Sequence, residues 1–231
     1  MKLNNKRTIL VGLAFLSICA FWQMYDSIVP LILTKTFHMN ETFSGAIMAA
    51  DNILALFLLP FFGSVSDKSH SKLGKRMPFI LFGTGCAIIL MNILPLLDNS
   101  YAAQPSGFKT ASFVIVLGLL LVAMGTYRAP AVALMPDVTP KPLRSRANAI
   151  INLMGAVGGI LYLGVAAVLY PNSKTAGVEH VNYQPLFIVV SAIMFVAVAV
   201  LFLTIREPKL TAENQALEKQ HPEWNLAQDD A

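Results

Sequence analysis

The chain has 231 residues, of which 55% are hydrophobic and only 13% are charged, and its mean hydropathy is +0.61. Soluble domains contain about 25% charged residues, so this composition nearly excludes a soluble domain and indicates a lipid bilayer as the solvent. The net charge of +4 fits nucleic acid, anionic lipid or cytoplasmic loops, and only the placement of the basic residues separates these classes.

Six apolar stretches follow one another along the chain. Each is long enough to cross a hydrocarbon core of roughly 30 Å at about 1.5 Å per helical residue. The stretches are continuous and lack a period of two, which favours helices over the strands of a barrel. The sequence therefore predicts an all-α membrane protein whose six-helix transmembrane bundle occupies residues 9–205, with helices at 9–33, 43–65, 78–97, 111–135, 147–170 and 185–205.

The segments on either side of the bundle are polar. Residues 1–8 are predicted to be a cytosolic N-terminus and not part of a signal peptide, because the apolar run that follows continues to Leu33 without a small-residue cleavage site. From Arg206 the composition becomes polar and includes Pro208 and Pro222. Residues 206–231 are therefore predicted to be a cytosolic tail or the start of a central linker, with a short helix at 212–220.

The basic residues divide unequally between the two sides that six spans define. Arg128 lies within a predicted span, and one side holds only Lys35, Lys109 and Lys174. By the positive-inside rule the richer side is cytoplasmic, so both termini are expected in the cytoplasm of a cell in whose plasma membrane the protein resides. Basic groups that flank a membrane in this way argue against a nucleic-acid partner. The richer side contains Lys2, Lys6, Arg7, Lys68, Lys72, Lys75, Arg76, Lys141, Arg144, Arg146, Arg206, Lys209 and Lys219.

The link between the second and third predicted helices carries the most specific motif in the chain. It reads GSVSDK and, after a short gap, GKRMP, so that its key residues are Gly63, Asp67, Lys68, Gly74, Lys75 and Arg76. This resembles the loop motif of the major facilitator superfamily, G-x-x-x-D-[RK] followed by G-[RK]-[RK], with the spacing of the sucrose–proton and glycoside–cation symporters. The alternative is that these are ordinary positive-inside charges.

Each motif residue has an expected physical role. Gly63 permits a close approach of helices, and Asp67 is expected to cap or pair with a neighbouring helix end. Lys75 and Arg76 are expected to bind lipid phosphate and neighbouring loops.

A second pattern supports the same resemblance. Arg144 and Arg146 open the fifth predicted helix shortly after Asp137, as in the sugar-symporter group, and these three complete the expected gating motif. Plant sucrose carriers typically have an Arg five residues before that Asp, whereas here Val132 occupies the place and Arg128 lies one helical turn earlier on the same face. Compared with melibiose-type carriers, Ala55 and Leu59 occur where cation-binding carboxylates would stand, which argues against a sodium site of that type.

The resemblance implies two inverted three-helix repeats, which form half of a twelve-helix major facilitator fold. It implies the N-terminal half of a secondary active transporter for a sugar or glycoside, proton-coupled, that works by alternating access. The partners would be the substrate, a proton or other cation, the lipid bilayer and a second six-helix half, supplied by a continuation of this chain, a homodimer or a separate chain. The alternative is a transport-incompetent half-carrier that acts as a membrane interaction or structural protein.

Three ionisable residues interrupt the apolar spans, at a cost of roughly 2.5–3.5 kcal/mol each on insertion scales, so they are expected to face a bundle interior or an aqueous cavity. Asp26 or Asp51 is predicted to be the proton-coupling carboxylate, the alternative for Asp26 being a structural hydrogen bond with Gln23 or a neighbouring helix. Arg128 is predicted to face a cavity, with substrate hydroxyls or Asp137 as its partner, or else to extend to the inner interface.

Side chains suited to sugar recognition lie near these charges. Aromatic faces stack on sugar C–H groups while amides and charged groups bond hydroxyls, so the predicted substrate-binding residues are Trp22, Gln23, Tyr25, Asn52, Tyr127 and Arg128. The alternative for the aromatic residues is that they anchor the helices at the membrane interface.

Two further features complete the sequence-based picture. Gly155 and Gly159 form a GxxxG step in the fifth helix, with Gly158 and Gly164 nearby, which predicts a smooth face for close helix packing. Cys19 and Cys86 lie in apolar runs, and no His, Cys or carboxylate cluster has the spacing of a nucleophile or a metal site. The sequence therefore predicts neither an enzyme nor a cofactor or metal.

Overall fold

The computed structural model describes residues 3–175 and 177–226, and Lys2 lies outside these described residues. The chain folds into six long helices, each long and apolar enough to span a bilayer, which confirms the predicted all-α membrane fold. They are α1 (Asn5–Leu31), α2 (Glu41–Asp67), α3 (Met77–Ala103), α4 (Gly107–Val138), α5 (Arg144–Leu169) and α7 (Gln184–Thr204). Shorter elements are η1 (Ile32–Thr36), η2 (Lys141–Leu143), α6 (Asn172–Thr175), α8 (Glu207–Gln220) and α9 (Glu223–Leu226).

Each long helix begins before the predicted apolar stretch, and α2, α3 and α4 also end after it, because polar residues continue these helices beyond the apolar runs. α1 begins at Asn5 after the side chain of Asn4 accepts a hydrogen bond from the backbone N–H of Arg7. α2 begins in the same way after Asn40, whose side chain accepts a hydrogen bond from the N–H of Thr42. Such caps satisfy N–H groups that a first helical turn leaves without partners.

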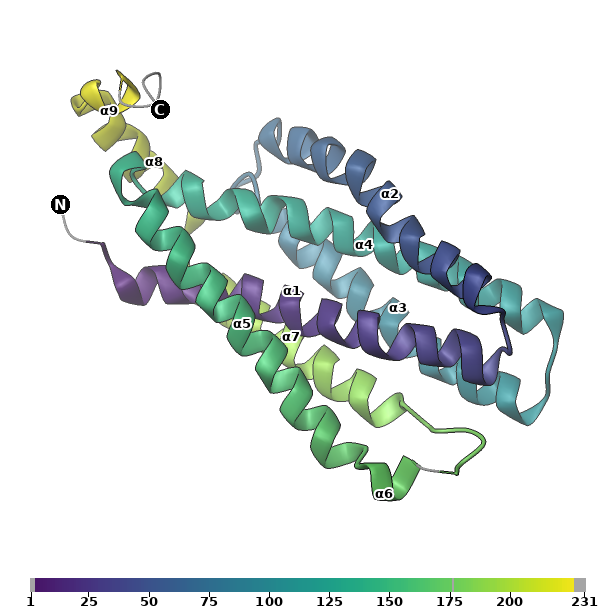
Figure 1. Ribbon diagram of the computed structural model, residues 1–231. Coiled ribbons are helices and arrows are strands. Elements are labelled where there is room, and N and C mark those ends of the chain that lie inside the picture. Colours follow the sequence, from purple (N-terminus) through teal and green to yellow (C-terminus); the bar gives the residue numbers. More distant parts are fainter. Residues whose placement is uncertain (1–2, 176, 227–231) are drawn as a thin grey trace.

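The long helices alternate in direction, so the bundle has two ends (Figure 1). The N-terminus, the link 68–76, the segment 139–143 and α8 gather at one end, which we call the terminal end. The links 37–40, 104–106 and 170–183 lie at the other, which we call the far end. The predicted short helix at 212–220 is part of the longer helix α8, which packs against the terminal end of α4.

Helix packing relates the first three long helices to the last three. α1 packs extensively on α5 just as α4 packs on α2, and α3 packs on α4 just as α7 packs on α1. Exchanging α1 with α4, α2 with α5 and α3 with α7 therefore reproduces the pattern, and the α3–α7 contact maps onto itself. This is the pairing expected of two inverted three-helix repeats.

α2 and α5 lie at the edge of the bundle and expose large apolar side chains. In the most apolar part of α2 no residue is buried, and in that of α5 only 22% of the residues are buried. Apolar surface of this extent is stable only against lipid or another protein. The exposed side chains include Ile53, Leu56, Phe57 and Phe61 on α2, and Leu153, Ile160 and Leu163 on α5.

Glycines on α5 allow the closest approach in the bundle. A Cβ atom at Gly158 would lie 2.0 Å from the carbonyl oxygen of Leu16, and one at Gly155 would lie 2.9 Å from the Cys19 sulfur. A Cβ at Gly159 would lie 3.8 Å from its nearest neighbour, the side chain of Gln23, which is ordinary contact. The tight step on α1 therefore uses Gly155 and Gly158, whereas the sequence predicted Gly155 and Gly159, because the crossing of the two helices selects the i, i+3 pair.

Gly158→Ala is expected to destabilise the bundle by about 1–3 kcal/mol, because the added methyl group meets rigid backbone. Gly164→Ala is the matched control on the same helix, since nothing lies within 4 Å of a Cβ there. Helix propensity alone makes the control neutral or stabilising by about 1 kcal/mol. Unfolding of both variants in mixed micelles measures the difference, and equal stabilities would contradict the packing described.

Candidate functional site

The surface shared by α1, α2 and α4 brings together three of the predicted site residues. Trp22 of α1, Asp51 of α2 and Arg128 of α4 line one small cavity of about 20 Å³. That volume is about what one water molecule needs, whereas ligand pockets measure about 300–1,000 Å³. The three residues thus form one wall of a site and not a closed pocket. The remaining lining is apolar or small: Leu54, Ala55, Leu58, Leu59, Leu121 and Gly125.

An aromatic group on α1 forms the base of this wall. The ring of Trp22 packs edge to face with those of Phe21 and Tyr25, at centroid separations of 5.4 and 5.3 Å. The guanidinium carbon of Arg128 lies 5.6 Å from the centre of the Trp22 ring, within the range of a cation–π interaction. Arg128 is therefore held against an aromatic face, and Asp137, one of its predicted partners, pairs with another arginine instead.

The two predicted coupling carboxylates lie near each other. Asp26 is exposed and Asp51 is partly buried, and they are close enough for their charges to interact. The hydroxyl of Tyr25 is buried without a hydrogen-bond partner and feels both charges. The side-chain amide of Asn52 donates a hydrogen bond of 2.7 Å to Asp51.

Asp26 makes no hydrogen bond within residues 3–175 and 177–226, and Gln23 is exposed nearby on α1. The carboxyl group of Asp26 is thus directed to the surroundings of this bundle and not into its core.

Tyr127 lies elsewhere than predicted. Its side chain is completely buried between α4 and α1, and its hydroxyl donates a 3.0 Å hydrogen bond to the carbonyl oxygen of Ala14 and lies 2.6 Å from the hydroxyl oxygen of Ser17. This placement differs from the expected role in substrate binding. Arg128, the next residue, points to a different side because neighbours on a helix are rotated by about 100°.

A second cluster surrounds Arg76 at the terminal end. The Arg76 guanidinium donates hydrogen bonds of 2.8 Å to Asp137 and 2.6 Å to the hydroxyl of Ser66, and it is also ion-paired with Asp67. It reaches the carbonyl oxygen of Gly63 at 3.4 Å. The cation thus lies at the C-terminal ends of both α2 and α4, where the helix dipoles favour positive charge.

Burial lowers the pKa of Arg76, but the hydrogen bonds and charges of Asp137 and Asp67 raise it by more, so the net direction is upward. Arg76 is 6% exposed, which contradicts its predicted contact with lipid phosphate: the two carboxylates occupy its donors. Lys68, Lys75 and Arg146 are exposed, as residues available to lipid or a partner would be.

Gly63 also differs from its expected role in close helix packing. Nothing in the described bundle lies within 4 Å of a Cβ at this position.

The sequence analysis missed Glu207, which caps α3. This carboxylate, 2% exposed, accepts backbone N–H hydrogen bonds from Lys75 at 2.7 Å, Arg76 at 2.9 Å and Met77 at 2.8 Å. Gly74 allows the approach, since its φ is +114° and a Cβ there would lie 2.3 Å from the carboxylate. One signal was present: α3 has Arg76 at its N-cap, which cannot accept these bonds, so an acceptor had to come from elsewhere.

The C-terminus of α4 is capped by three side chains from other elements. Arg144 donates hydrogen bonds to the carbonyl oxygens of Pro136 at 2.9 Å and Thr139 at 3.1 Å, and it pairs with Glu218 of α8 at 3.0 Å. Arg7 donates to the carbonyl oxygen of Val138. The side-chain amide of Asn214 on α8 donates a 3.1 Å hydrogen bond to the carbonyl oxygen of Asp137. α8 is therefore attached to the same helix ends that surround Arg76.

Glu207→Gln is expected to lower the free energy of unfolding by about 2 kcal/mol, because an amide cannot accept all the N–H bonds and carries no charge for the helix dipole. The matched control is Glu213→Gln on the same helix, whose carboxylate is 50% exposed and lies 3.9 Å from Lys209, and a change within about 0.5 kcal/mol is expected there. Denaturant unfolding measures both. Equal effects would contradict the capping role.

Arg76→Lys keeps the charge but loses the planar fork that reaches two carboxylates and a hydroxyl. A loss of about 1–2 kcal/mol is expected, moderated because Asp67 is 61% exposed. Arg146→Lys, at an exposed position on α5, is expected to be neutral. The same unfolding measurement compares them, and a neutral Arg76→Lys would show that the guanidinium geometry is unimportant.

Comparisons with known proteins agree with this architecture. The chain is 35% identical over 158 residues to sucrose transport protein SUC3 of Arabidopsis thaliana, which covers 63% of the chain and 26% of that protein. It is 36% identical over 154 residues to sucrose transport protein SUT3 of Oryza sativa subsp. indica, a match that covers 61% of the chain and 30% of that protein. It is also 25% identical over 186 residues to human solute carrier family 45 member 3, a match that covers 79% of the chain and 34% of that protein.

The matched stretches thus span between about a quarter and a third of the length of these relatives. The family model of the Major Facilitator Superfamily matches residues 11–226, which includes all six long helices and α8. With the inverted helix triplets and the Arg76 cluster, this match identifies the chain as a multi-pass membrane protein of the Major Facilitator Superfamily, related to sugar transporters.

Proposed function

We propose that this chain forms the N-terminal six-helix half of a proton-coupled carrier for a sugar or glycoside. The single observation that carries the proposal is the wall where Trp22, Asp51 and Arg128 meet on three helices. Charges this deep in apolar spans are costly unless they line a polar route. The names of the sucrose transport relatives support a sugar as the substrate class.

Alternating access requires a second wall opposite this one. The cavity of about 20 Å³ is too small for a sugar, so a second six-helix half would enclose the substrate against α1, α2 and α4. The exposed apolar faces of α2 and α5 are suited to contact that half. It would be supplied by a continuation of the chain, a second copy or a separate chain.

Substrate recognition would use the aromatic and amide groups of the wall. The Trp22 ring offers a face for sugar C–H groups, while Arg128 beside it donates hydrogen bonds to hydroxyls. Tyr25 has a buried hydroxyl without a partner, and Gln23 and Asn52 are exposed amides at the same level of the wall.

Asp26 and Asp51 would carry the coupling proton. The two neighbouring carboxylates would repel when both are charged, so one of them would bind a proton where a closed carrier excludes water and release it when the surroundings become wetter. Coupling follows if substrate binding changes that hydration.

The Arg76 cluster would control closure at the terminal end. Gly63 has open space beside it, so the second half could approach α2 there, next to Asp67, the more exposed of the two carboxylates that hold Arg76. Breaking and remaking the exposed ion pair would accompany opening and closing. Asp137, Arg144 and Arg146 lie in the adjoining segment of α4 and α5.

The orientation follows from charge. The terminal end carries most of the basic residues, so we place it, with both termini, on the cytoplasmic side of a plasma membrane.

The coupling proposal is tested in the complete carrier that contains this chain. Asp26→Asn or Asp51→Asn is expected to abolish proton-driven accumulation while sugar exchange survives, because the neutral amide cannot carry the proton. A membrane potential of 100 mV supplies about 2.3 kcal/mol per proton, or roughly fiftyfold accumulation, and that is the factor to be lost. Uptake of labelled sucrose into energised vesicles measures it.

The control is Glu41→Gln in the exposed first turn of α2, for which normal accumulation is expected. If both aspartate variants accumulate sugar normally, the coupling group lies elsewhere.

The small cavity also favours a second candidate, a half-carrier that moves no solute by itself and acts through contact with another membrane protein. Liposomes that contain only this chain separate the two. Saturable sugar flux would indicate a self-pairing transporter, whereas a sealed bilayer would support an interaction role for the isolated chain.

A further inference from the structure

A buried carboxylate lies at the far end of the bundle, away from the wall described above. Asp98 of α3 is 0% exposed, and neither of its side-chain oxygens has a hydrogen bond of normal geometry, although the hydroxyl of Thr36 and the imidazole of His180 are near enough to favour its charged form. An ionised carboxylate in such a place costs several kcal/mol unless a cation or a proton compensates it.

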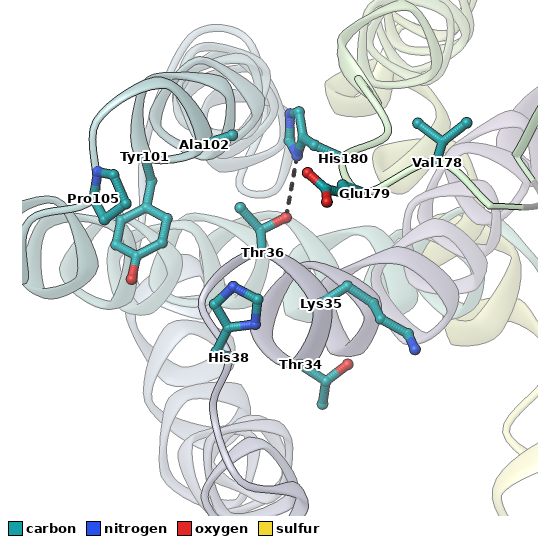
Figure 2. A pocket seen from close by; sticks show the side chains of 10 residues that line it. All are labelled: Thr34, Lys35, Thr36, His38, Tyr101, Ala102, Pro105, Val178, Glu179 and His180. Carbon is teal, nitrogen blue, oxygen red and sulfur yellow. Dashed lines mark hydrogen bonds between the residues drawn. The ribbon is translucent and has the colours of Figure 1, made fainter.

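The nearest compensating group is His180, in the link between α6 and α7. Its Nε2 atom lies 3.9 Å from Oδ2 of Asp98 and 2.9 Å from the side-chain oxygen of Asn99. Its Nδ1 atom lies 3.4 Å from the hydroxyl oxygen of Thr36, where η1 ends (Figure 2). Both ring nitrogens therefore face oxygen atoms, so that each could donate a hydrogen bond if both carried a proton.

The contacts of His180 join three parts of the chain. We call Thr36, Asp98, Asn99, His180 and Asn182 the His180 cluster. The amide of Asn99 donates a 2.9 Å hydrogen bond to Asn182, and Asn182 in turn accepts one from the first turn of α7. The cluster thus links the end of α1 and η1 to α3 and to the segment 177–183.

Water reaches the cluster through an open cavity of about 670 Å³ at the far end. Figure 2 shows the His180 ring beside Thr36, with Tyr101 on the other side of the cavity. His180 and Thr36 both line this cavity, whereas Asp98 lies behind them in the core. The imidazole thus lies between the cavity and the buried carboxylate.

Other titratable groups lie near the His180 cluster on η1, on α3, on α5 and on the segments that connect the helices at the far end. The pKa of Tyr183 is raised by burial and by the charge of Asp98, so this phenol stays neutral at physiological pH. Lys35, His38 and Glu179 line the cavity without a hydrogen bond or ion pair to Asp98. Among the side chains that the structure describes, the phenols of Tyr101 on α3, Tyr162 on α5 and Tyr170 after it also lie at this end.

We propose that Asp98 and His180 form a proton-binding site that fastens the segment 177–183 to the ends of α1 and α3. One proton is shared by the pair. With that proton on His180, the imidazolium neutralises Asp98 and donates hydrogen bonds to Thr36 and Asn99.

The direction of the pH dependence follows from the charge balance. At low pH the pair is compensated and the segment is held closed. When the proton leaves, a lone buried carboxylate remains, and separation of the segment from α3 lets water reach it. The stabilisation of the closed segment is therefore present at low pH and lost as pH rises. In the proposed orientation this end faces the outside, although the proton site itself does not depend on sugar transport.

Backbone hydrogen exchange in this chain held in nanodiscs tests the proposal, read at Val178 and at Gln184, Leu186 and Phe187, whose N–H groups bond Thr175, Asn182 and Tyr183 at the two ends of the segment. After correction for intrinsic exchange, protection is expected to fall about tenfold or more between roughly pH 5 and pH 8. Asp98→Asn removes the charge but keeps the shape, and His180→Gln keeps a polar side chain that cannot titrate. Both variants are expected to exchange independently of pH. His38→Gln, which changes the other histidine of the same cavity, is expected to keep the step.

A flat profile in the unaltered chain overturns the proposal, as does a step that survives in Asp98→Asn or in His180→Gln. Loss of the step in His38→Gln overturns it as well, because the titrating group would then be His38. If Asp98→Asn fails to fold, His180→Gln decides alone, since its substitution at the cavity surface leaves α3 unchanged.

Discussion

The cost of placing charge in a medium that cannot solvate it governs this molecule. A bundle of apolar helices could form without Arg76, Glu207 or Asp98, yet each of these residues is at most 6% exposed. The first two are compensated completely: Arg76 by Asp67 and Asp137, Glu207 by the first N–H groups of α3. Because these contacts join α2, α3, α4 and α8, the balance of charge at the terminal end also fixes how the helices meet there.

The core of the bundle and the wall formed by α1, α2 and α4 satisfy this constraint in different ways. The core is closed by close packing, as where Gly158 admits the backbone of α1 and where Tyr127 bonds Ser17 and Ala14. The wall of α1, α2 and α4 leaves Asp26 exposed and Arg128 partly buried against an aromatic ring. Charges that remain uncompensated inside the bundle require compensation from outside it, by water, by a ligand or by another protein. This is why the proposed function places the substrate and the coupling proton on that wall.

Sequence reasoning succeeded where one residue's own chemistry decides the outcome. Continuous apolar runs predict the six spans, and the motif residues Asp67, Arg76 and Asp137 were named from the sequence, although their pairing with one another was not predicted. It failed where the outcome depends on the rotation of one helix against another. The amino-acid sequence alone does not show that Gly158, and not Gly159, contacts α1. Nor does it show that Tyr127 faces the core while Arg128 faces the wall. Glu207 lay in a polar tail, and its role depends on a chain reversal that brings it to residues far earlier in the sequence. Whether Asp26 and Asp51 serve coupling stays a prediction.

The two ends of the bundle differ in how firmly their charges are held, and this bears on motion. At the terminal end the cation is an arginine, which keeps its charge at all physiological pH values, so rearrangement there must exchange one partner for another. At the far end the proposed partner of the buried carboxylate is His180, and histidine is the side-chain type whose charge depends on pH near neutrality. A carrier that opens alternately at its two ends needs both to be breakable but not by the same signal. In the carrier proposed above, a contact replaced by docking of a second half and a contact released by loss of a proton would meet that requirement, because neither event directly weakens the other end.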